Sequence, residues 1–136
     1  MHSHKLKPAW ELSSDEIGPD DIRNLHRQLA ELLEGMQGVL DEGASPIGLI
    51  PFLDRYIELT LQHFATEEAL MLELAFPEYD SHKQMHDWSV EQVYQVDRIA
   101  LIDNPDKAQE LVDQLDDWLR AHVCADLDMA ARVFNT

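Results

Sequence analysis

Hydrophobic side chains recur along most of the chain at intervals of three and four residues. Near the start they fall at Ile22, Leu25, Leu29 and Leu32, and polar residues occupy most of the positions between them. This spacing places the apolar side chains on one face of an α-helix. Three later stretches show the same period. The sequence therefore predicts four amphipathic helices, spanning about residues 19–41, 46–74, 78–102 and 105–133.

Prolines mark the expected helix boundaries. Pro19, Pro46 and Pro105 each follow a residue that can cap a helix, and proline is tolerated in a first turn because no intrahelical N–H bond is lost there. Phe76 and Pro77 interrupt the period between the second and third helices. No strand-like alternation competes with this pattern. Short connections between long helices favour an antiparallel, up-down-up-down four-helix bundle, so the predicted fold class is all-α.

Length and charge narrow the class of protein. A chain of 136 residues suits one domain, so we expect a single domain over residues 1–136, with a non-helical leader at residues 1–17. The net charge of −17 argues against binding to nucleic acid or anionic membranes, which require a basic face. The longest charge-free run is too short to span a membrane, and the N-terminus lacks the apolar core of a signal peptide. We therefore expect a cytoplasmic protein.

Most of the histidines lie on the apolar faces of the predicted helices, where polar side chains are unusual. A single buried histidine is ordinarily a hydrogen-bonded core residue. Several imidazoles and carboxylates buried without partners would each cost on the order of several kcal/mol. Imidazoles outnumber carboxylates in this set, so mutual pairing cannot satisfy them, whereas metal coordination can. The candidate metal ligands are His26, His63, Glu67, His82, His86, His122 and Asp126.

The number of candidate ligands favours two metal ions over one. A single tetrahedral zinc ion would take four ligands and strand the rest. Five imidazoles and two carboxylates suit two octahedral ions with the carboxylates bridging them. Iron is the natural candidate for mixed imidazole and carboxylate ligation, although ligand type alone leaves manganese and zinc open. His2 and His4 lie in the leader and are interpreted as incidental.

Three short sequence motifs are similar to those of a known protein family. They are HFxxEE at residues 63–68, HxxxH at residues 82–86 and WLxxHV at residues 118–123. Trp10 and His26 add an upstream tryptophan and a first-helix histidine. Together they resemble the hemerythrin family, specifically its single-domain bacterial members, over nearly the whole chain. The resemblance implies the same four-helix bundle, so the expected fold rests partly on it.

The resemblance implies two iron ions in an oxo- or hydroxo-bridged centre that binds dioxygen reversibly. One iron would be held by His82, His86 and His122, and the other by His26 and His63. Glu67 and an aspartate of the last helix would bridge them. The second iron would then keep an open position, where dioxygen would bind. The expected apolar wall of the oxygen pocket is Phe64, Trp118, Leu119 and Val123.

The chain departs from the family at that aspartate. The family usually places it five residues after the last histidine, and this position is Leu127 here. On a straight helix Asp126 lies about 40° from His122, whereas Asp128 lies about 120° away. We therefore predict that Asp126 is the ligand and that Asp128 lies at the surface.

The expected role is a carrier, store or delivery protein for dioxygen, not an enzyme. Ferritin-like oxidases use Glu-x-x-His steps, and no glutamate of this chain is followed three residues later by histidine. The alternative is a di-iron protein that senses oxygen or redox state, or that senses or detoxifies nitric oxide. No protein partner is predicted. Glu68 is expected to be solvated, since it points about 100° away from Glu67, and Cys124 to be packed and inert.

Overall fold

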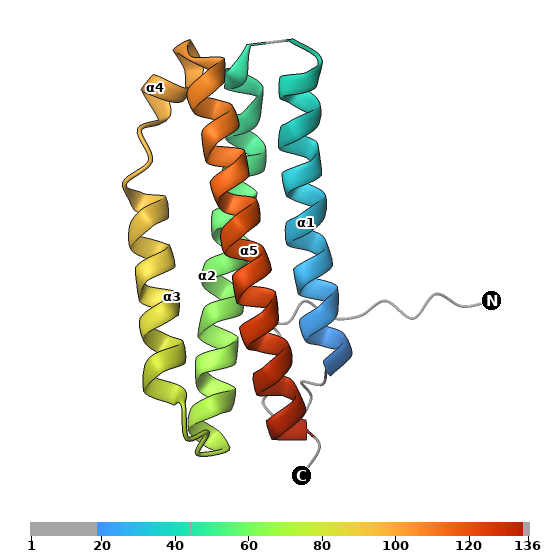
Figure 1. The fold of residues 1–136 in the computed structure, drawn as a ribbon, viewed down its shortest axis with the longest axis vertical. Coiled ribbons are helices and arrows are strands. Elements are labelled where there is room, and N and C mark those ends of the chain that lie inside the picture. The colour runs from blue at the N-terminus through green and yellow to red at the C-terminus, as the bar shows by residue number, and fades with distance from the viewer. Residues whose placement is uncertain (1–18, 44, 135–136) are drawn as a thin grey trace, which may run out of the picture.

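Four long helices and two short ones make up the part of the chain that the structure describes. The computed structural model describes residues 19–43 and 45–134. The elements are α1 (Pro19–Asp41), the 3₁₀ helix η2 (Pro46–Leu49), α2 (Ile50–Glu73), α3 (Tyr79–Tyr94), α4 (Arg98–Asp103) and α5 (Pro105–Phe134). The long helices α1, α2, α3 and α5 alternate in direction, and α4 lies at one end of the bundle (Figure 1). The predicted all-α, up-down-up-down bundle is confirmed, and no strand occurs in the described ranges.

Proline and asparagine define the start of the longest helix. α5 begins at Pro105, one residue after Asn104. The Oδ1 atom of Asn104 accepts hydrogen bonds from the backbone N–H groups of Asp106 at 3.0 Å and Lys107 at 3.3 Å. These N–H groups have no partner within the helix, so the asparagine side chain satisfies two of them. α1 likewise begins at a proline, Pro19.

The predicted second helix, residues 46–74, is divided into η2 and α2. Ser45 precedes η2, and its hydroxyl accepts a hydrogen bond from the N–H of Ile47 at 3.4 Å. Pro51 lies in the first turn of α2. Because proline has no N–H, the α-helical hydrogen bond from residue 51 back to residue 47 cannot form. The N–H of Ile50 donates to the carbonyl of Ile47, three residues back, so the chain enters α2 through a tighter 3₁₀ turn.

The prediction of one continuous helix over residues 78–102 is wrong. α3 ends at Tyr94, and α4 starts three residues after Gln95. Asp97 separates them with φ −86° and ψ 98°, and its side chain accepts a hydrogen bond from the N–H of Ala100 at 3.1 Å. An aspartate that caps a new helix in this way competes with continuation of the old one. The apolar period runs on through the break, so the pattern alone predicted no interruption.

The turn between α2 and α3 fixes the relative position of these two helices. The N–H of Phe76 donates to the carbonyl of Met71 at 2.9 Å, and the N–H of Ala75 donates to that of Leu72 at 3.2 Å. Ala75 has a positive φ of 52°. These three features define a Schellman motif, in which a left-handed residue ends the helix. The expected interruption at Phe76 and Pro77 is thus a tight turn.

The buried apolar side chains form two clusters along the bundle axis. The larger cluster combines α1, η2, α2, α4 and α5. It consists of Leu25, Leu29, Leu33, Met36, Leu49, Leu53, Tyr56, Leu59, Leu101, Ala108, Leu111, Val112, Leu115 and Leu119. The smaller cluster consists of Ile22, Leu70, Met71, Phe76 and Met129. Along α2 and α5 the chain passes from one cluster to the other through buried polar residues.

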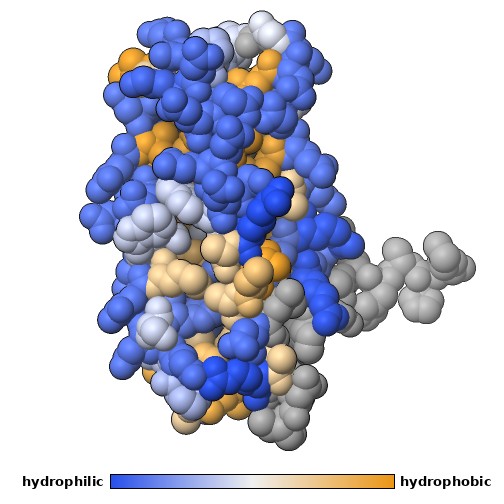
Figure 2. Space-filling model, viewed as in Figure 1, coloured by the Kyte–Doolittle hydropathy of each residue, from blue (hydrophilic) through white to orange (hydrophobic). Residues whose placement is uncertain are grey.

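The face of the bundle that Figure 2 shows is mainly hydrophilic. Blue, hydrophilic residues dominate the face seen in Figure 2, with smaller apolar areas between them. This agrees with an excess of acidic over basic residues, 27 against 10. Within the described residues, no helix is both long enough and apolar enough to cross a membrane.

Candidate metal centre

Seven polar side chains from four helices meet between the two apolar clusters. α1 supplies one, α2 two, α3 two and α5 two. They are His26, His63, Glu67, His82, His86, His122 and Asp126, and all are buried. Residues four apart on a helix share one face, so each pair from α2, α3 and α5 points inward together. The structure thus brings together every residue that the sequence nominated as a ligand.

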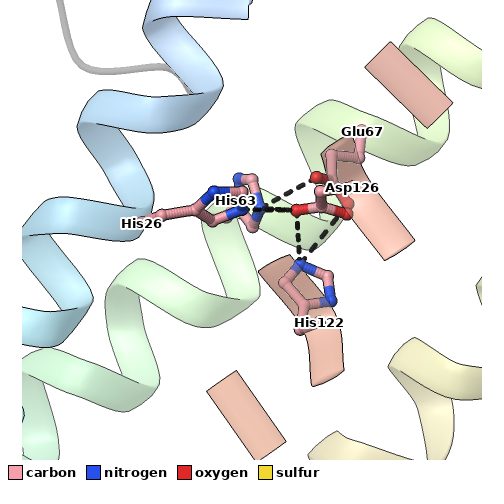
Figure 3. A group of neighbouring side chains, drawn as sticks. All are labelled: His26, His63, Glu67, His122 and Asp126. Carbon is pink, nitrogen blue, oxygen red and sulfur yellow. Dashed lines mark hydrogen bonds and ion pairs between the residues drawn. The ribbon is translucent and has the colours of Figure 1, made fainter. Parts of the chain in front are cut away.

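Asp126 lies at the middle of the histidines. Its Oδ2 atom is 2.7 Å from the Nε2 of His26, 2.8 Å from that of His63 and 2.7 Å from that of His122. Its Oδ1 atom is 3.1 Å from the Nε2 of His82. Figure 3 shows the imidazoles of His26, His63 and His122 directed at this carboxylate. One buried aspartate therefore contacts imidazoles from all three of the other long helices and from its own.

Glu67 forms a second point of convergence. Its Oε2 atom is 2.8 Å from the Nε2 of His63. Its Oε1 atom is 3.0 Å from the Nε2 of His86, 3.4 Å from that of His82 and 3.7 Å from that of His122. The two oxygens of this carboxylate therefore face different histidines. Such a carboxylate is placed to bridge two metal positions.

The ligand atoms divide into two overlapping groups, each within 4.8 Å. The first group is His26, His63, Glu67, His122 and Asp126, and the second is Glu67, His82, His86, His122 and Asp126. Both carboxylates belong to both groups. His122 is also common to the two, whereas the other histidines belong to one group each. The arrangement therefore offers two adjacent metal positions with shared carboxylates.

Hydrogen bonds among these side chains do not satisfy them. Both side-chain oxygens of Glu67, the Nε2 of His86 and both ring nitrogens of His122 are buried, and none makes a hydrogen bond of acceptable geometry among the described residues, although several lie within 3.0 Å of an oppositely charged group. Buried polar atoms of this kind are costly and need a partner. Imidazole nitrogens with carboxylate oxygens form a donor set that transition metals favour. The residues present thus fit a metal centre.

Strong electrostatic coupling accompanies this packing. Burial lowers the pKa of His63, but the charges and hydrogen bonds of Glu67 and Asp126 outweigh it and raise that pKa to about 10. The same opposition raises the pKa of His82 to about 9. Burial raises the pKa of Glu67, yet its attraction to His63 brings it down to about 2. For His122 burial prevails, and its pKa is lowered. The carboxylates are therefore anionic at neutral pH and attract cations.

Glu68 holds one of the histidines in place. Its Oε2 atom accepts a hydrogen bond from the Nδ1 of His86 at 3.0 Å, and its Oε1 atom pairs with Lys83 at 3.2 Å. The ring of Phe64 stacks on His86, with centroids 3.8 Å apart and planes within 6°. A carboxylate behind a metal-binding histidine fixes its orientation and increases its basicity.

The prediction that Glu68 is solvated is wrong, since its side chain is only 20% exposed. A residue that points about 100° away from the ligand face is directed towards α3 instead of water, because the bundle places a helix there. The feature of the sequence that indicates this role is the second glutamate of the HFxxEE motif, which directly follows Glu67.

A small cavity adjoins the centre at His122. Its volume is about 30 Å³, and three of the four expected pocket residues, Phe64, Trp118 and Leu119, line it. The remaining lining residues are Leu29, Tyr56, Thr60, Ser89, Val93 and Leu115. Val123 does not line this cavity; it packs against the larger apolar cluster. Thr60, Ser89 and Val93 were not nominated from the sequence because their spacing resembles ordinary packing.

Two other residues of α5 are exposed to solvent. Asp128 is exposed and lies 3.7 Å from Arg132, as expected for a surface residue. Cys124 is also exposed, so the prediction that it is packed is wrong. Two positions after His122, it lies about 200° around the helix, away from the ligand face. Four positions of interest in the sequence lie outside the described residues or side chains: His2, His4, Trp10 and Leu127.

Comparisons with known proteins agree with this geometry. The family described as "Hemerythrin HHE cation binding domain" matches residues 15–126. A bacteriohemerythrin of Stenotrophomonas maltophilia (strain R551-3) is 30% identical over 110 residues, which cover 81% of this chain and 71% of the relative. A bacteriohemerythrin of Pseudomonas aeruginosa (strain LESB58) is 26% identical over 102 residues, which cover 75% of this chain and 65% of the relative. The match therefore spans just under two thirds of that relative's length. No solved structure matches the chain.

Proposed function

The chain belongs to the hemerythrin family, and from this membership we propose that it is a non-haem di-iron protein that binds dioxygen reversibly. The observation that carries the proposal is the pair of overlapping ligand groups that share Glu67 and Asp126. An apolar cavity next to His122 supports it further. The two irons, when bound, would supply the electrons for reversible binding of dioxygen.

The proposed ligand assignment follows the two groups. His82 and His86 would hold one iron, and His26 and His63 the other, with both carboxylates bridging. His122 belongs to both groups by distance, and we assign it to the iron of His82 and His86 on the family resemblance. This assignment leaves fewer protein ligands on the iron of His26 and His63.

The side chains around the cavity would protect the bound ligand. Phe64 and Leu119 are buried and apolar, and they offer no hydrogen-bonding side-chain group to water on the side of His122. A dry pocket restrains proton delivery and so favours reversible binding over oxidation chemistry. Apart from His122, none of the described residues that line the cavity has a side chain that is charged at neutral pH. We therefore propose a non-enzymatic carrier or store that acts in the cytoplasm.

Metal analysis and visible spectra test the proposal directly. The purified chain is expected to hold two irons, and the reduced protein to gain a visible absorption band in air that disappears when dioxygen is removed. One zinc ion per chain would contradict the di-iron centre. Rapid oxidation without a reversible band would instead favour the alternative, a sensor or a protein that handles nitric oxide.

A further inference from the structure

A hollow lined by α3, α5 and the turn before α3 reaches one of the candidate metal ligands. It has a volume of about 240 Å³, and His82 forms part of its wall. The other lining residues are Phe76, Glu78, Ser81, Met85, Ala125, Asp128 and Arg132. Ser81 and Asp128 are exposed, whereas His82 is buried. The hollow therefore joins the surface of the bundle to the edge of the metal centre.

We propose that this hollow is where divalent metal ions enter the centre, and that the carboxylates of Glu78 and Asp128 attract them to it. The proposal rests on the proposed function only in taking the centre to be a metal site. Both carboxylates line the same hollow as the imidazole of His82. A cation that exchanges water for carboxylate oxygens and then for imidazole never loses its hydration without a replacement, which is the costly step in burying an ion.

The cavity at His122 offers a cation a poorer path. It is lined mainly by apolar side chains, and its polar residues Tyr56, Thr60 and Ser89 are uncharged at neutral pH. Moving an ion into such surroundings costs far more free energy than moving an uncharged molecule. Of these two hollows, the one at His82 therefore suits a metal ion.

The ligands behind His82 are close enough to receive an ion from it. The Nε2 atom of His82 lies 3.1 Å from the Oδ1 of Asp126 and 3.4 Å from the Oε1 of Glu67. Each of these two carboxylates belongs to both ligand groups. An ion that reaches His82 therefore meets the side chains that the two metal positions share.

Arg132 limits the negative charge that the hollow presents. Its Nη2 atom is 2.7 Å from the Oε1 of Glu78, and its Nη1 atom is 3.7 Å from the Oδ2 of Asp128. The guanidinium also lies 5.1 Å from the centre of the Phe76 ring. The three charged side chains are between 44% and 69% exposed, and ion pairs this exposed are weak. An incoming divalent cation can therefore displace the arginine from the carboxylates.

Uptake of Co²⁺ by the metal-free full chain tests this route, because Co²⁺ held by imidazoles and carboxylates absorbs visible light and needs no dioxygen. Asp128→Asn and Glu78→Gln each remove one negative charge and should slow uptake several-fold, as expected for a divalent cation near one charge in water. Arg132→Gln should speed it by a similar factor. The amount bound at saturation should stay constant, because none of the three belongs to a ligand group. High salt should reduce the differences in rate. Stopped-flow absorbance measures the rate constants.

Matched controls on α5 separate the local charge from the net charge of the chain. Asp117→Asn and Arg120→Gln change the net charge by the same amounts, but both residues are exposed and line neither hollow. They should leave the uptake rate nearly unaltered, and circular dichroism checks that each variant is folded. Equal slowing by Asp117→Asn and Asp128→Asn would overturn the proposal. Rates that ignore Asp128 but fall with Val93→Phe, which adds bulk to the apolar cavity, would overturn it in favour of that cavity.

Chemical modification varies the charge at one position of one folded protein. Cys124→Ser combined with Asp128→Cys leaves a single cysteine, at the hollow. Methanethiosulfonate reagents then attach either a sulfonate or a trimethylammonium group to it. The sulfonate form should take up Co²⁺ several-fold faster than the trimethylammonium form, and reductive removal of either group should abolish the difference. The same rate in both forms would contradict entry through this hollow.

The outcomes distinguish the entry route from the proposed function. A chain that binds no Co²⁺ would overturn the metal centre and the entry route together. Binding at one common rate in all variants would overturn the entry route alone. If the iron-loaded protein shows no reversible band in air, the proposed binding of dioxygen fails, and the Co²⁺ rates still decide where metal ions enter.

Discussion

At the scale of single residues, Glu68 shows how the bundle orients a candidate metal ligand through a neighbouring carboxylate. It accepts the hydrogen bond from the Nδ1 of His86 and is itself held by Lys83. Glu68→Gln removes the charge and keeps the size. Metal affinity should fall by roughly 10- to 100-fold, the usual loss when such a partner is changed. Competition with a chelator measures this affinity.

The matched control for Glu68 is Glu58→Gln. Glu58 lies on the same helix, but it is exposed, pairs with Arg55 and belongs to neither ligand group. This change should leave metal affinity unaltered. Equal affinities for the two variants would show that the contact with His86 does not support the centre.

The two aspartates near the end of α5 can be separated by substitution. Asp126 is fully buried among the histidines, whereas Asp128 is exposed. Asp126→Ala should abolish binding of at least one metal ion, because both ligand groups contain this carboxylate. Asp128→Ala should retain the full metal content. Metal analysis of the purified variants decides between them, and the reverse result would mean that Asp128 is the ligand.

The raised pKa values of two histidines predict how stability depends on pH after metal removal. The pKa of His63 is about 10 and that of His82 about 9, both above the unperturbed 6.5. Their protonation therefore stabilises the fold fully below about pH 6.5, and this contribution is lost as pH rises through 9 and 10. Chelator-treated protein should lose unfolding free energy across that range, as measured by urea unfolding.

At acid pH, the unfolding free energy depends on pH with the opposite sign. The pKa of Glu67 is lowered from 4.5 to about 2, so its contribution is present above pH 4.5 and is lost as pH falls towards 2. Metal-loaded protein is the control for the alkaline limb, because metal ions replace the protons on the imidazoles. Its unfolding free energy should not decline between pH 7 and 10. An equal decline with and without metal would contradict the proton exchange.

Much of the site could be predicted from single residues, since histidine and carboxylate on an apolar stripe are conspicuous. The four-residue steps in the sequence are enough to place His63 with Glu67 and His122 with Asp126 on shared helix faces. Glu68 and Thr60 could not be placed in the same way. Their positions depend on which neighbouring helix faces them, and a one-dimensional period contains no information about that neighbour.

At the scale of helices and turns, the end of α2 offers a test of backbone strain. Ala75 has a φ of 52°, a conformation that costs a residue with a Cβ about 1–2 kcal/mol. Ala75→Gly should therefore stabilise the protein by about 1 kcal/mol. Ala69→Gly, on the exposed face within α2, should instead destabilise it by about 1 kcal/mol. Urea unfolding of both variants measures the contrast, and a shift of the same sign would contradict the argument.

The helix boundaries also show which helix starts can be predicted from the sequence. Pro105 after Asn104 marked the start of α5 because both residues act locally, within one turn. The break before α4 was missed because the apolar period continues across it and only the capping side chain of Asp97 reveals it. Local chemistry overrides periodicity when a side chain satisfies the backbone of a new helix.

At the scale of the whole molecule, the polar layer lies between two separate apolar clusters. Each of the four long helices contributes at least one ligand to it. A metal centre here therefore joins all four helices at a level where hydrophobic packing is interrupted. Neither cluster alone extends along the full length of the helices. The bundle therefore depends on the polar layer to join its two ends, and the polar layer depends on the bundle to bring its side chains together.

The contact between His26 and Asp126 joins residues that are 100 positions apart. Synthesis proceeds from the N-terminus, so a nascent chain displays His26, His63 and Glu67 well before α5 has left the ribosome. Neither ligand group is complete until Asp126 has emerged and α5 has docked. We therefore expect complete loading with metal to follow docking of α5, and a truncated product that lacks this helix would form neither ligand group in full.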